Sequence, residues 1–310
     1  MKILLTINKT LTNGKTKWLD GGYHNVFLPL QDLGHDVYFW DTVNPDEPNY
    51  QKVIDKFKPD LIFCCMTGDV GLTPYESNAW EVIPKETEKG NIKTFNWFCD
   101  DTWRFESFSS KVCKAFSICS TPEPEYVEKY KNIGYENIIV GGWHTNDKLY
   151  SQKQQEKKYD IVFIGQMNNP DRNRYIQYLI DNGVDIKNFH GVSHEQMTKI
   201  LSESKIGINF SKNYNGTSPR TQMKLRPFEI AAAKNTLVLS EYHNGLEYFF
   251  KPDKEIVCFK NANEMLKKTK ALLSNDRIRE NIALSGNKRF SLEHSSHERM
   301  KHILKKINDI

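Results

Sequence analysis

The sequence has no long apolar run, no surplus of one charge and no cysteines at metal-binding spacing. No stretch approaches the ~18 consecutive apolar residues that cross a bilayer, and the apolar segment Lys2–Ile7 is too short for a signal peptide. The 43 Lys and Arg against 39 Asp and Glu give a net charge of +4, which is too small to predict nucleic-acid binding. We therefore expect a soluble, cytoplasmic protein without stable membrane insertion.

Two further absences concern metals and disulfides. The six cysteines lie in or beside apolar segments, and no Cys-x-x-Cys pair occurs, which disfavours a zinc site or a disulfide framework. No Asp-x-Asp motif flanked by apolar strand residues is present, because Asp100 and Asp101 are adjacent. We expect reduced, mostly buried thiols, no obligatory metal and no cofactor.

What the sequence does contain is a regular alternation of apolar segments with helical or loop segments. With 38% hydrophobic and 26% charged residues it is typical of a globular protein, and 310 residues is near the size at which one core splits into two. Several segments are apolar on both faces, as in parallel sheets covered by helices. The strands predicted in the first half are 2–7, 36–40, 60–66, 93–99, 115–120 and 137–140.

A polar stretch divides this pattern. Residues 151–158 carry no apolar side chain and predict a linker. The alternation then restarts, and from Ala262 the pattern is helical to the end, with polar breaks near Ser274 and Ser285. In the second half we predict strands at 159–165, 185–190, 205–210, 236–240 and 255–259, and helices at 171–182, 194–202 and 225–233.

The pattern predicts an α/β fold of two Rossmann-like domains, residues 1–150 and 151–310, that face each other across a cleft. A helical C-terminal tail completes the chain, and we expect its last helix to pack back on the N-terminal domain. Ligands of open α/β sheets bind outside the carboxyl ends of the strands, so functional residues are sought there.

The segment Lys224–Glu241 carries the strongest functional signal. A helix beginning near Pro227 would direct its positive dipole end toward Arg220, Lys224 and Arg226. Glu229, in the same first turn, has the chemistry to accept both hydroxyls of a ribose while the basic side chains take the adjacent diphosphate. The alternative is that Glu229 only complements the helix dipole and the basic residues are solvated.

The order of motifs around this segment resembles a known family. The C-terminal half is similar to the donor domain of the spore-maturation-protein type of glycosyltransferase, a branch similar to the family 4 retaining enzymes with the GT-B fold. The resemblance covers roughly residues 159–305 and is weaker over 1–150, where it rests on Lys58–Phe63 and the strand rhythm. The motifs that carry it are Arg226-Pro-Phe-Glu229, Leu237–Ser240, Asn244–Phe249, Lys254–Val257, Asn263–Met265, Asn281–Gly286 and Leu292–His294.

The resemblance implies roles for particular residues of the second domain, the nucleotide-sugar donor domain. Glu229 would bind the ribose, and the loop from Gly165 and Gln166 to Arg172 would approach the diphosphate. The loop has its own physical logic, because a glycine at a strand end admits close backbone approach and the N–H groups of the next helix attract phosphate. Arg172 is alternatively a surface residue.

Two other positions in this half are considered with the donor. His190 and Gly191 end the next strand in the same crevice, with His190 either a base or ribose contact or a structural residue. Family 4 enzymes also carry a second glutamate eight positions before the ribose-binding one, and here that position is Thr221. The usual contact to the donor sugar is therefore missing or supplied by another residue.

In the first domain, the acceptor side, three features follow predicted strands. Gly21 and Gly22 either let backbone amides reach the donor phosphates or form an ordinary turn, and His24 beside them is a candidate for acceptor or phosphate contact. Asp100 and Asp101 end the fourth strand. One reading makes Asp100 an acceptor-binding group or base and Asp101 a helix N-cap, with nearby tryptophans stacking on sugars.

These residues predict a glycosyltransferase, a hexosyl- or pentosyltransferase that moves a sugar from a nucleotide-diphosphate sugar to an acceptor hydroxyl. Lys224, Arg220 or Arg226 would neutralise the leaving diphosphate without a metal, and the resemblance implies retention of configuration. The alternatives are a nucleotide-sugar epimerase of the same architecture and a non-catalytic nucleotide-sugar-binding protein. The acceptor is left open among a glycan, a lipid-linked glycan, a protein and a modified nucleic acid.

Overall fold

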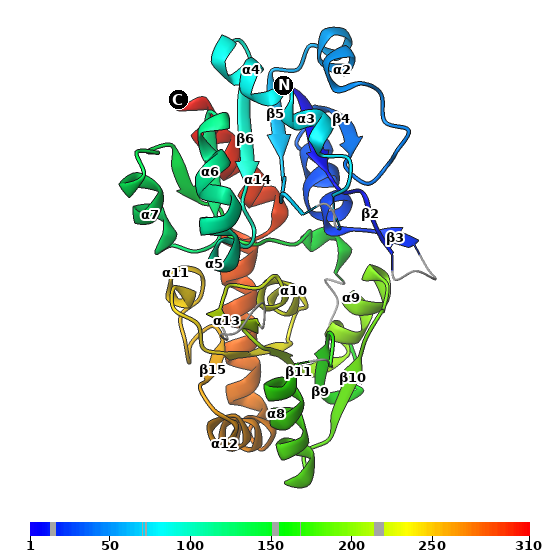
Figure 1. Ribbon diagram of the computed structural model, residues 1–310. Coiled ribbons are helices and arrows are strands. Elements are labelled where there is room, and N and C mark those ends of the chain that lie inside the picture. Colours follow the sequence, from blue (N-terminus) through cyan, green and yellow to red (C-terminus); the bar gives the residue numbers. More distant parts are fainter. Residues whose placement is uncertain (13–16, 70, 72, 151–154, 168, 214–219) are drawn as a thin grey trace. The chain divides into compact units, whose positions relative to one another are not determined.

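A computed structural model describes the chain except for residues 13–16, 70, 72, 151–154, 168 and 214–219 (Figure 1). It consists of two compact units. Unit 1 is Met1–Gly142 together with Ser296–Ile310, and unit 2 is Trp143–Ser295. The division falls at Gly142 rather than at residue 150, and the last fifteen residues belong to unit 1. Of the predicted linker, residues 151–154 lie outside the described part, and 155–158 form no helix or strand.

Unit 1 is built on a six-stranded parallel sheet, and all six strands predicted for the first half are confirmed. Its order is β4-β1-β5-β6-β7-β8. Chain connections leave β1 toward one side and β5 toward the other, so the topological switch point lies between these two strands. The bounds are β1 Lys2–Ile7, β4 Asp36–Asp41, β5 Leu61–Cys64, β6 Lys93–Trp97, β7 Ile118–Thr121 and β8 Ile138–Val140.

Short helices connect these strands. The longer ones are α2 (Tyr50–Phe57), α4 (Ile83–Lys89) and α7 (Tyr126–Asn132), and a small hairpin of β2 (Thr10–Thr12) and β3 (Lys17–Leu19) follows β1. The remaining elements of this unit are η1 Gly22–Phe27, α1 Leu28–Asp32, α3 Ser77–Trp80, α5 Asp101–Arg104, η2 Phe105–Ser109, α6 Ser110–Val112, η3 Cys113–Ala115 and α14 Ser296–Asn308.

Helix α14 is far from the rest of unit 1 in sequence but packs against α1 and η1. It buries one apolar stripe, formed by Met300, Ile303, Leu304 and Ile307. Its other face carries lysines, as expected for a helix that covers a core on one side.

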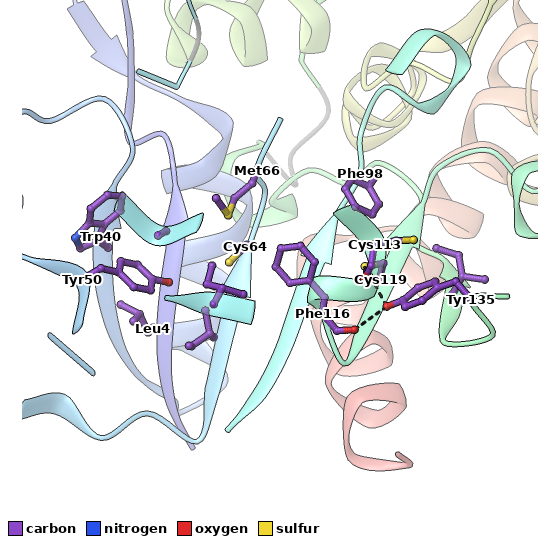
Figure 2. Close-up of a cluster of buried hydrophobic side chains, with 14 of the residues drawn as sticks. Leu4, Trp40, Tyr50, Cys64, Met66, Phe98, Cys113, Phe116, Cys119 and Tyr135 are labelled. Carbon is purple, nitrogen blue, oxygen red and sulfur yellow. Dashed lines mark hydrogen bonds between the residues drawn. The ribbon is translucent and has the colours of Figure 1, made fainter. Parts of the chain in front are cut away.

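The core of unit 1 is rich in aromatic rings and thiols (Figure 2). The Trp40 and Tyr50 rings meet edge to face with centroids 5.1 Å apart, and the Tyr50 hydroxyl bonds to Thr6 Oγ1 at 2.6 Å. The Tyr135 hydroxyl donates to the Phe116 carbonyl at 3.1 Å. All six cysteines of the chain are free thiols and five are buried, which confirms the expectation from their apolar surroundings.

Unit 2 repeats the same plan with a five-stranded parallel sheet of order β10-β9-β11-β14-β15. Its switch point lies between β9 and β11. The five predicted strands are confirmed, with ends that differ from the predicted ones by at most two residues. Their bounds are β9 Tyr159–Ile164, β10 Ile186–Phe189, β11 Ser204–Asn209, β14 Leu237–Glu241 and β15 Val257–Phe259.

The helices of unit 2 match the predictions except at one break. Asn275 caps α13, so the break near Ser274 is confirmed. Ser285 instead lies inside α13, where its hydroxyl donates to the Asn281 carbonyl one turn earlier. The helical segment is interrupted instead at His294 and Ser295, between α13 and α14. The elements are η4 Asp147–Leu149, α8 Pro170–Asp181, α9 His194–Ser202, β12 Lys212–Asn213, β13 Arg220–Thr221, α10 Arg226–Ala232, α11 Leu246–Phe249, α12 Ala262–Leu273 and α13 Asp276–Glu293.

Candidate functional site

In unit 2, several of the predicted residues gather at the carboxyl ends of β9 and β10. Gly165 and Gln166 follow β9 directly, and the Gly165 N–H donates to the carbonyl of Phe189 at the end of β10 at 2.9 Å. His190 and Gly191 come next and are exposed, with Gly191 in the left-handed region at φ +66°. The β9 and β10 loops therefore lie side by side at the sheet edge.

Arg172 reaches back from the first turn of α8 to this edge. Its Nη1 donates to the Gln166 carbonyl, and its guanidinium lies over the rings of Phe163 and Phe210 at 5.1 and 5.7 Å. Burial lowers the pKa of Arg172, and the carboxylate of Glu241 opposes this shift. The side chain is half-buried and held over the strand ends, unlike a solvated surface arginine.

The N–H groups at the start of α8 are already bonded within the chain. Pro170 has no N–H, and the Asn169 side-chain oxygen accepts from the N–H groups of Asp171 and Arg172 at 3.1 and 3.2 Å. A phosphate at these amides would have to displace the Asn169 cap. Asn168, in the same loop, lies outside the described residues.

Packing gives Gly165 a different reason for being glycine from the one expected. A Cβ at this position would lie 2.8 Å from Cζ of Phe163. Removing the side chain thus makes room for the ring on which Arg172 is stacked. The glycine supports the position of the arginine as well as any approach of a ligand.

Lys212 and Glu241 are neighbours at this edge that the sequence analysis missed. Glu241 ends β14, is 4% exposed, and accepts from the N–H groups of Ser211 and Lys212, both at 3.1 Å. The Lys212 ammonium lies 3.2 Å from Glu241 and 3.6 Å from Asp171. Both residues follow strands that were predicted correctly, so their place at the strand ends was the available signal.

The predicted ribose-binding glutamate lies in the first turn of α10. Glu229 is 5% exposed, and its Oε2 is 2.7 Å from Nη1 of Arg226. The same nitrogen contacts the sulfur of Met197 on α9 at 2.6 Å. Glu229 and Arg226 thus form an ion pair one turn apart on α10, and Arg226 also contacts α9.

The other basic candidates lie on the segment that leads into α10. Arg220 is exposed and Thr221 is half-buried on β13, where Thr221 stands opposite Lys212 in the antiparallel pair. Lys224 is half-buried between β13 and α10. Trp143 donates to the neighbouring Met223 carbonyl at 3.1 Å, which anchors the segment.

Tyr150 is a further residue beside the Glu229 pair, and the sequence analysis did not identify it. Its side chain is buried, and burial raises the pKa of its hydroxyl, with an added rise from the charge of Glu229. A Thr145 hydrogen bond and the charge of Arg226 oppose these effects. Tyr150 is therefore a protonated phenol, able to donate a hydrogen bond, at neutral pH.

In unit 1, the glycines and histidine predicted for the first strand's carboxyl end are close to β1. A Cβ at Gly22 would lie 2.5 Å from the carbonyl oxygen of Asn8, whereas one at Gly21 would make only an ordinary 3.4 Å contact with Asn25. Gly22 lets η1 begin against the end of β1. His24 is half-buried, and burial lowers the pKa of its imidazole, so the ring is neutral at pH 7.

The paired aspartates after β6 do not divide as predicted. Asp100 occupies the N-cap position of α5 without a capping hydrogen bond from its side chain. Asp101, expected as the cap, is instead fully buried and accepts from the Tyr130 hydroxyl at 2.9 Å. Asp101 has a structural role because it is buried in the core, and not because it caps α5.

Arg104 connects Asp100 to the loop after β5. Its Nη2 is 3.0 Å from Asp69 Oδ2 and its Nε is 3.7 Å from Asp100 Oδ2, while Nη1 donates to the Thr67 carbonyl. The arginine side chain is 7% exposed, and the Asp69 and Asp100 side chains are 36% and 23% exposed. A buried cation thus holds two accessible carboxylates at the sheet edge.

Two features are absent from the residues that the structure describes. Nowhere in that part of the chain do three or more His, Cys, Asp or Glu side chains come together as ligands for a metal ion. Within the same residues, every helix is too short or too polar to cross a bilayer.

Two doubly wound parallel sheets in one chain, with basic and acidic side chains at their carboxyl edges, are the plan of GT-B glycosyltransferases, and the fold is of that type. The glycosyl transferase-like family matches residues 148–305. This is just over half of the chain, and the protein belongs to that family.

Solved structures with little sequence identity share the fold. A glycosyltransferase from Rickettsia africae is 12% identical with a TM-score of 0.65, covering 99% of this chain and 98% of its own. Anabaena Alr3699/HepE in complex with UDP and glucose is 12% identical with a TM-score of 0.63, and both chains are covered completely.

A third structure is longer than this protein. A point mutant of S. aureus TarM, in complex with fondaparinux, α-GlcNAc-glycerol and UDP, is 14% identical with a TM-score of 0.57. The alignment covers 80% of this chain, which spans 55% of the TarM chain. No curated protein matches the sequence.

Proposed function

We propose that this glycosyltransferase takes its sugar from a nucleotide-diphosphate sugar, with UDP as the nucleotide, and transfers it to an acceptor hydroxyl. The observation that carries the proposal is the ion pair of the buried Glu229 with the half-buried Arg226, within the family-matched residues. The complexes of TarM and Alr3699/HepE with UDP support the choice of nucleotide. The motif order around Arg226–Glu229 supports the spore-maturation-like branch, close to family 4.

On the donor side, the proposed roles follow from charge and position. Glu229, held by Arg226, accepts the ribose hydroxyls, because an ionised carboxylate accepts two strong hydrogen bonds. Arg172, fixed over Phe163 and beside Gln166, meets the diphosphate at the ends of β9 and β10. Arg220 and Lys224 add positive charge from the segment before α10, and the exposed His190 and Gly191 border the nucleotide.

The chemical difficulty of the transfer is the negative charge that develops on the departing diphosphate. Fixed cations aimed at that group stabilise the transition state more than the ground state, and one such donor contributes roughly 10²–10³ in rate. Arginine and lysine side chains would supply this stabilisation in a metal-independent reaction. Retention of configuration is proposed on the family resemblance, with the acceptor oxygen attacking the face of the sugar from which the diphosphate departs.

On the acceptor side, Asp100 and His24 are proposed to orient or deprotonate the acceptor hydroxyl. The neutral imidazole of His24 has the lone pair that a base requires. Asp100 keeps an accessible carboxylate beside Arg104. Gly21 and Gly22 would let the backbone of η1 approach the donor phosphates. Thr221, opposite Lys212 on the β12–β13 pair, is proposed to contact the donor sugar by its hydroxyl.

The first prediction concerns UDP binding, measured by isothermal titration calorimetry. Glu229→Ala removes a charged acceptor of the ribose hydroxyls, so it should weaken UDP binding roughly 10- to 100-fold, the equivalent of about 1.5–3 kcal/mol. Glu195→Ala is the matched control, because Glu195 is a glutamate in the first turn of the neighbouring helix α9. The Glu195→Ala variant should bind UDP with the same affinity as the wild type.

Thermal unfolding of both variants separates loss of binding from loss of folding. Unchanged UDP affinity in a folded Glu229→Ala protein contradicts the ribose assignment. A second measurement addresses the reaction itself, since incubation with UDP-GlcNAc and no acceptor should give slow hydrolysis or no change. Formation of a sugar epimer would instead identify an epimerase, and nucleotide binding without transfer to any acceptor would identify a non-catalytic binding protein.

A further inference from the structure

Unit 1 contains a pocket that the proposed transfer does not use. It has a volume of about 330 Å³, at the lower end of small-molecule sites. It is lined by parts of β1, β4 and α2 and by Pro48 before α2, and Figure 1 shows these elements in the blue part of the chain. The lining residues are Lys2, Tyr38, Pro48, Lys52, Val53, Lys56 and Phe57.

The pocket is separate from the carboxyl edge of the sheet. Lys2 is the first residue of β1, and five steps along the strand bring the chain to Ile7. At about 3.3 Å per residue, this is roughly 17 Å. The glycines and His24 follow the far end of the same strand, so a ligand here would occupy a second site.

The walls of the pocket are apolar and aromatic. The Tyr38 and Phe57 rings lie with centroids 5.7 Å apart, and Val53 and Pro48 extend the apolar surface. Such a surface binds a ring or short chain because burial removes apolar area from water.

The rim of the pocket is cationic. Lys52 and Lys56 are one turn apart on α2 and both are exposed. Among the described residues, neither ammonium group has a hydrogen-bond or ion-pair partner. Lys2 adds a third ammonium, which donates to the Phe57 carbonyl at 3.3 Å and lies over the Phe57 ring at 5.5 Å.

Nearby carboxylates are mostly engaged with other groups. Asp55 accepts from the Gln51 amide at 2.9 Å, and Asp60 accepts from the Lys2 backbone N–H at 2.7 Å. Glu47, which acts electrostatically on Tyr38, accepts from the Asn44 amide at 3.1 Å. The lysines of α2 are thus left to attract a negative ligand.

We propose that this pocket binds a phosphate monoester whose apolar part, a ring or a short chain, packs against Tyr38 and Val53 while its phosphate meets Lys52 and Lys56. A dianionic phosphate satisfies two ammonium groups at once, and the apolar walls select an ester over inorganic phosphate. The ester has two sources, a soluble metabolite or the headgroup of an anionic lipid.

The test is an NMR titration of the full chain with phenyl phosphate and, separately, with inorganic phosphate. Phenyl phosphate should shift the amide signals of residues 48–57 and bind at least about tenfold more tightly than inorganic phosphate, because only the ester buries a ring. The double variant Lys52→Ala/Lys56→Ala should weaken this binding by roughly tenfold or more. Lys301→Ala/Lys305→Ala, the same charge loss one turn apart on α14, should leave it unchanged.

Vesicles of phosphatidylcholine with and without phosphatidic acid distinguish the two sources. Co-sedimentation that requires phosphatidic acid and both α2 lysines identifies a lipid, and binding of phenyl phosphate alone identifies a soluble ester. The proposal is overturned if neither probe binds, if the α2 lysines do not matter, or if inorganic phosphate binds as tightly as phenyl phosphate. None of these measurements needs glycosyl transfer, so failure here leaves the donor proposal untouched.

Discussion

At the scale of single residues, burial of the Asp101 carboxyl group makes the free energy of unfolding depend on pH. Burial raises its pKa to about 6, while hydrogen bonds from Thr121, Ser109 and Tyr130 lower it in part. The folded protein therefore holds the proton more tightly than the unfolded chain, whose value is near 3.8. Stability from this group is greatest below pH 4 and falls as the pH rises to about 6.

Asp101→Asn should remove most of this dependence. A shift of about two pKa units corresponds to about 3 kcal/mol, and the asparagine carbonyl can still accept from Tyr130. The difference in unfolding free energy between variant and wild type should favour the variant by more at pH 7.5 than at pH 4.5. Urea unfolding at both pH values measures it, with Glu106→Gln on the exposed side of η2 as control.

A pH-independent difference between Asp101→Asn and the wild type would contradict the burial argument. A large loss of stability at both pH values would mean that the carboxyl proton, not the carbonyl oxygen, is essential to the cluster with Tyr130. Glu106 serves as the control because its side chain is exposed, so Glu106→Gln leaves the buried cluster of Asp101 and Tyr130 intact.

At the scale of elements, the sequence was sufficient to place every strand of the two main sheets. The reason is that segments such as Leu61–Cys64 are apolar on both faces, a pattern that a surface helix does not produce. The short elements were missed because they have too few residues for a period to show. These include the β2–β3 hairpin and the β12–β13 pair.

The candidate site was predictable only in part. Strand ends identify Gly165, Gln166 and Asp100, because each follows closely after an apolar run. Lys212 and Tyr150 were missed, since their significance depends on Glu241 and Glu229, which are distant in sequence. The capping of α8 by Asn169 was also invisible, although an asparagine before a proline is a known helix start.

At the beginning of η1, substituting either of two adjacent glycines by alanine should change the free energy of unfolding in opposite directions. Gly22→Ala should destabilise the protein by about 1–3 kcal/mol, because the new Cβ would meet the Asn8 carbonyl at 2.5 Å. Gly21→Ala should stabilise it by about 0.5 kcal/mol, because the backbone there is helical at φ −53° and alanine restricts the unfolded chain. Urea unfolding of both variants gives the comparison, and equal effects would contradict the close approach.

At the scale of the whole molecule, α14 belongs to unit 1, although it follows unit 2 in the sequence. Met300 is fully buried there, and Met300→Ala should cost about 2–5 kcal/mol. Hydrogen exchange followed by mass spectrometry should show lost protection in unit 1, with α1 and η1 affected first. Leu272→Ala, in the core of unit 2, should give the reverse pattern.

If both substitutions reduced protection equally in both units, the two cores would unfold as one body. Separate responses would mean that each sheet, with its own helices, is a cooperative element of stability. We expect separate responses, because each unit contains its own parallel sheet and the helices that cover that sheet.

The position of α14 has a consequence for how the protein is made. On a ribosome, Met1–Gly142 emerge first, yet the stripe that covers α1 and η1 is translated only after all of Trp143–Ser295. The middle of the polypeptide can therefore reach its native state before the beginning does. Until α14 has emerged from the ribosome, the apolar surface of α1 and η1 is uncovered. During that interval a chaperone can bind it.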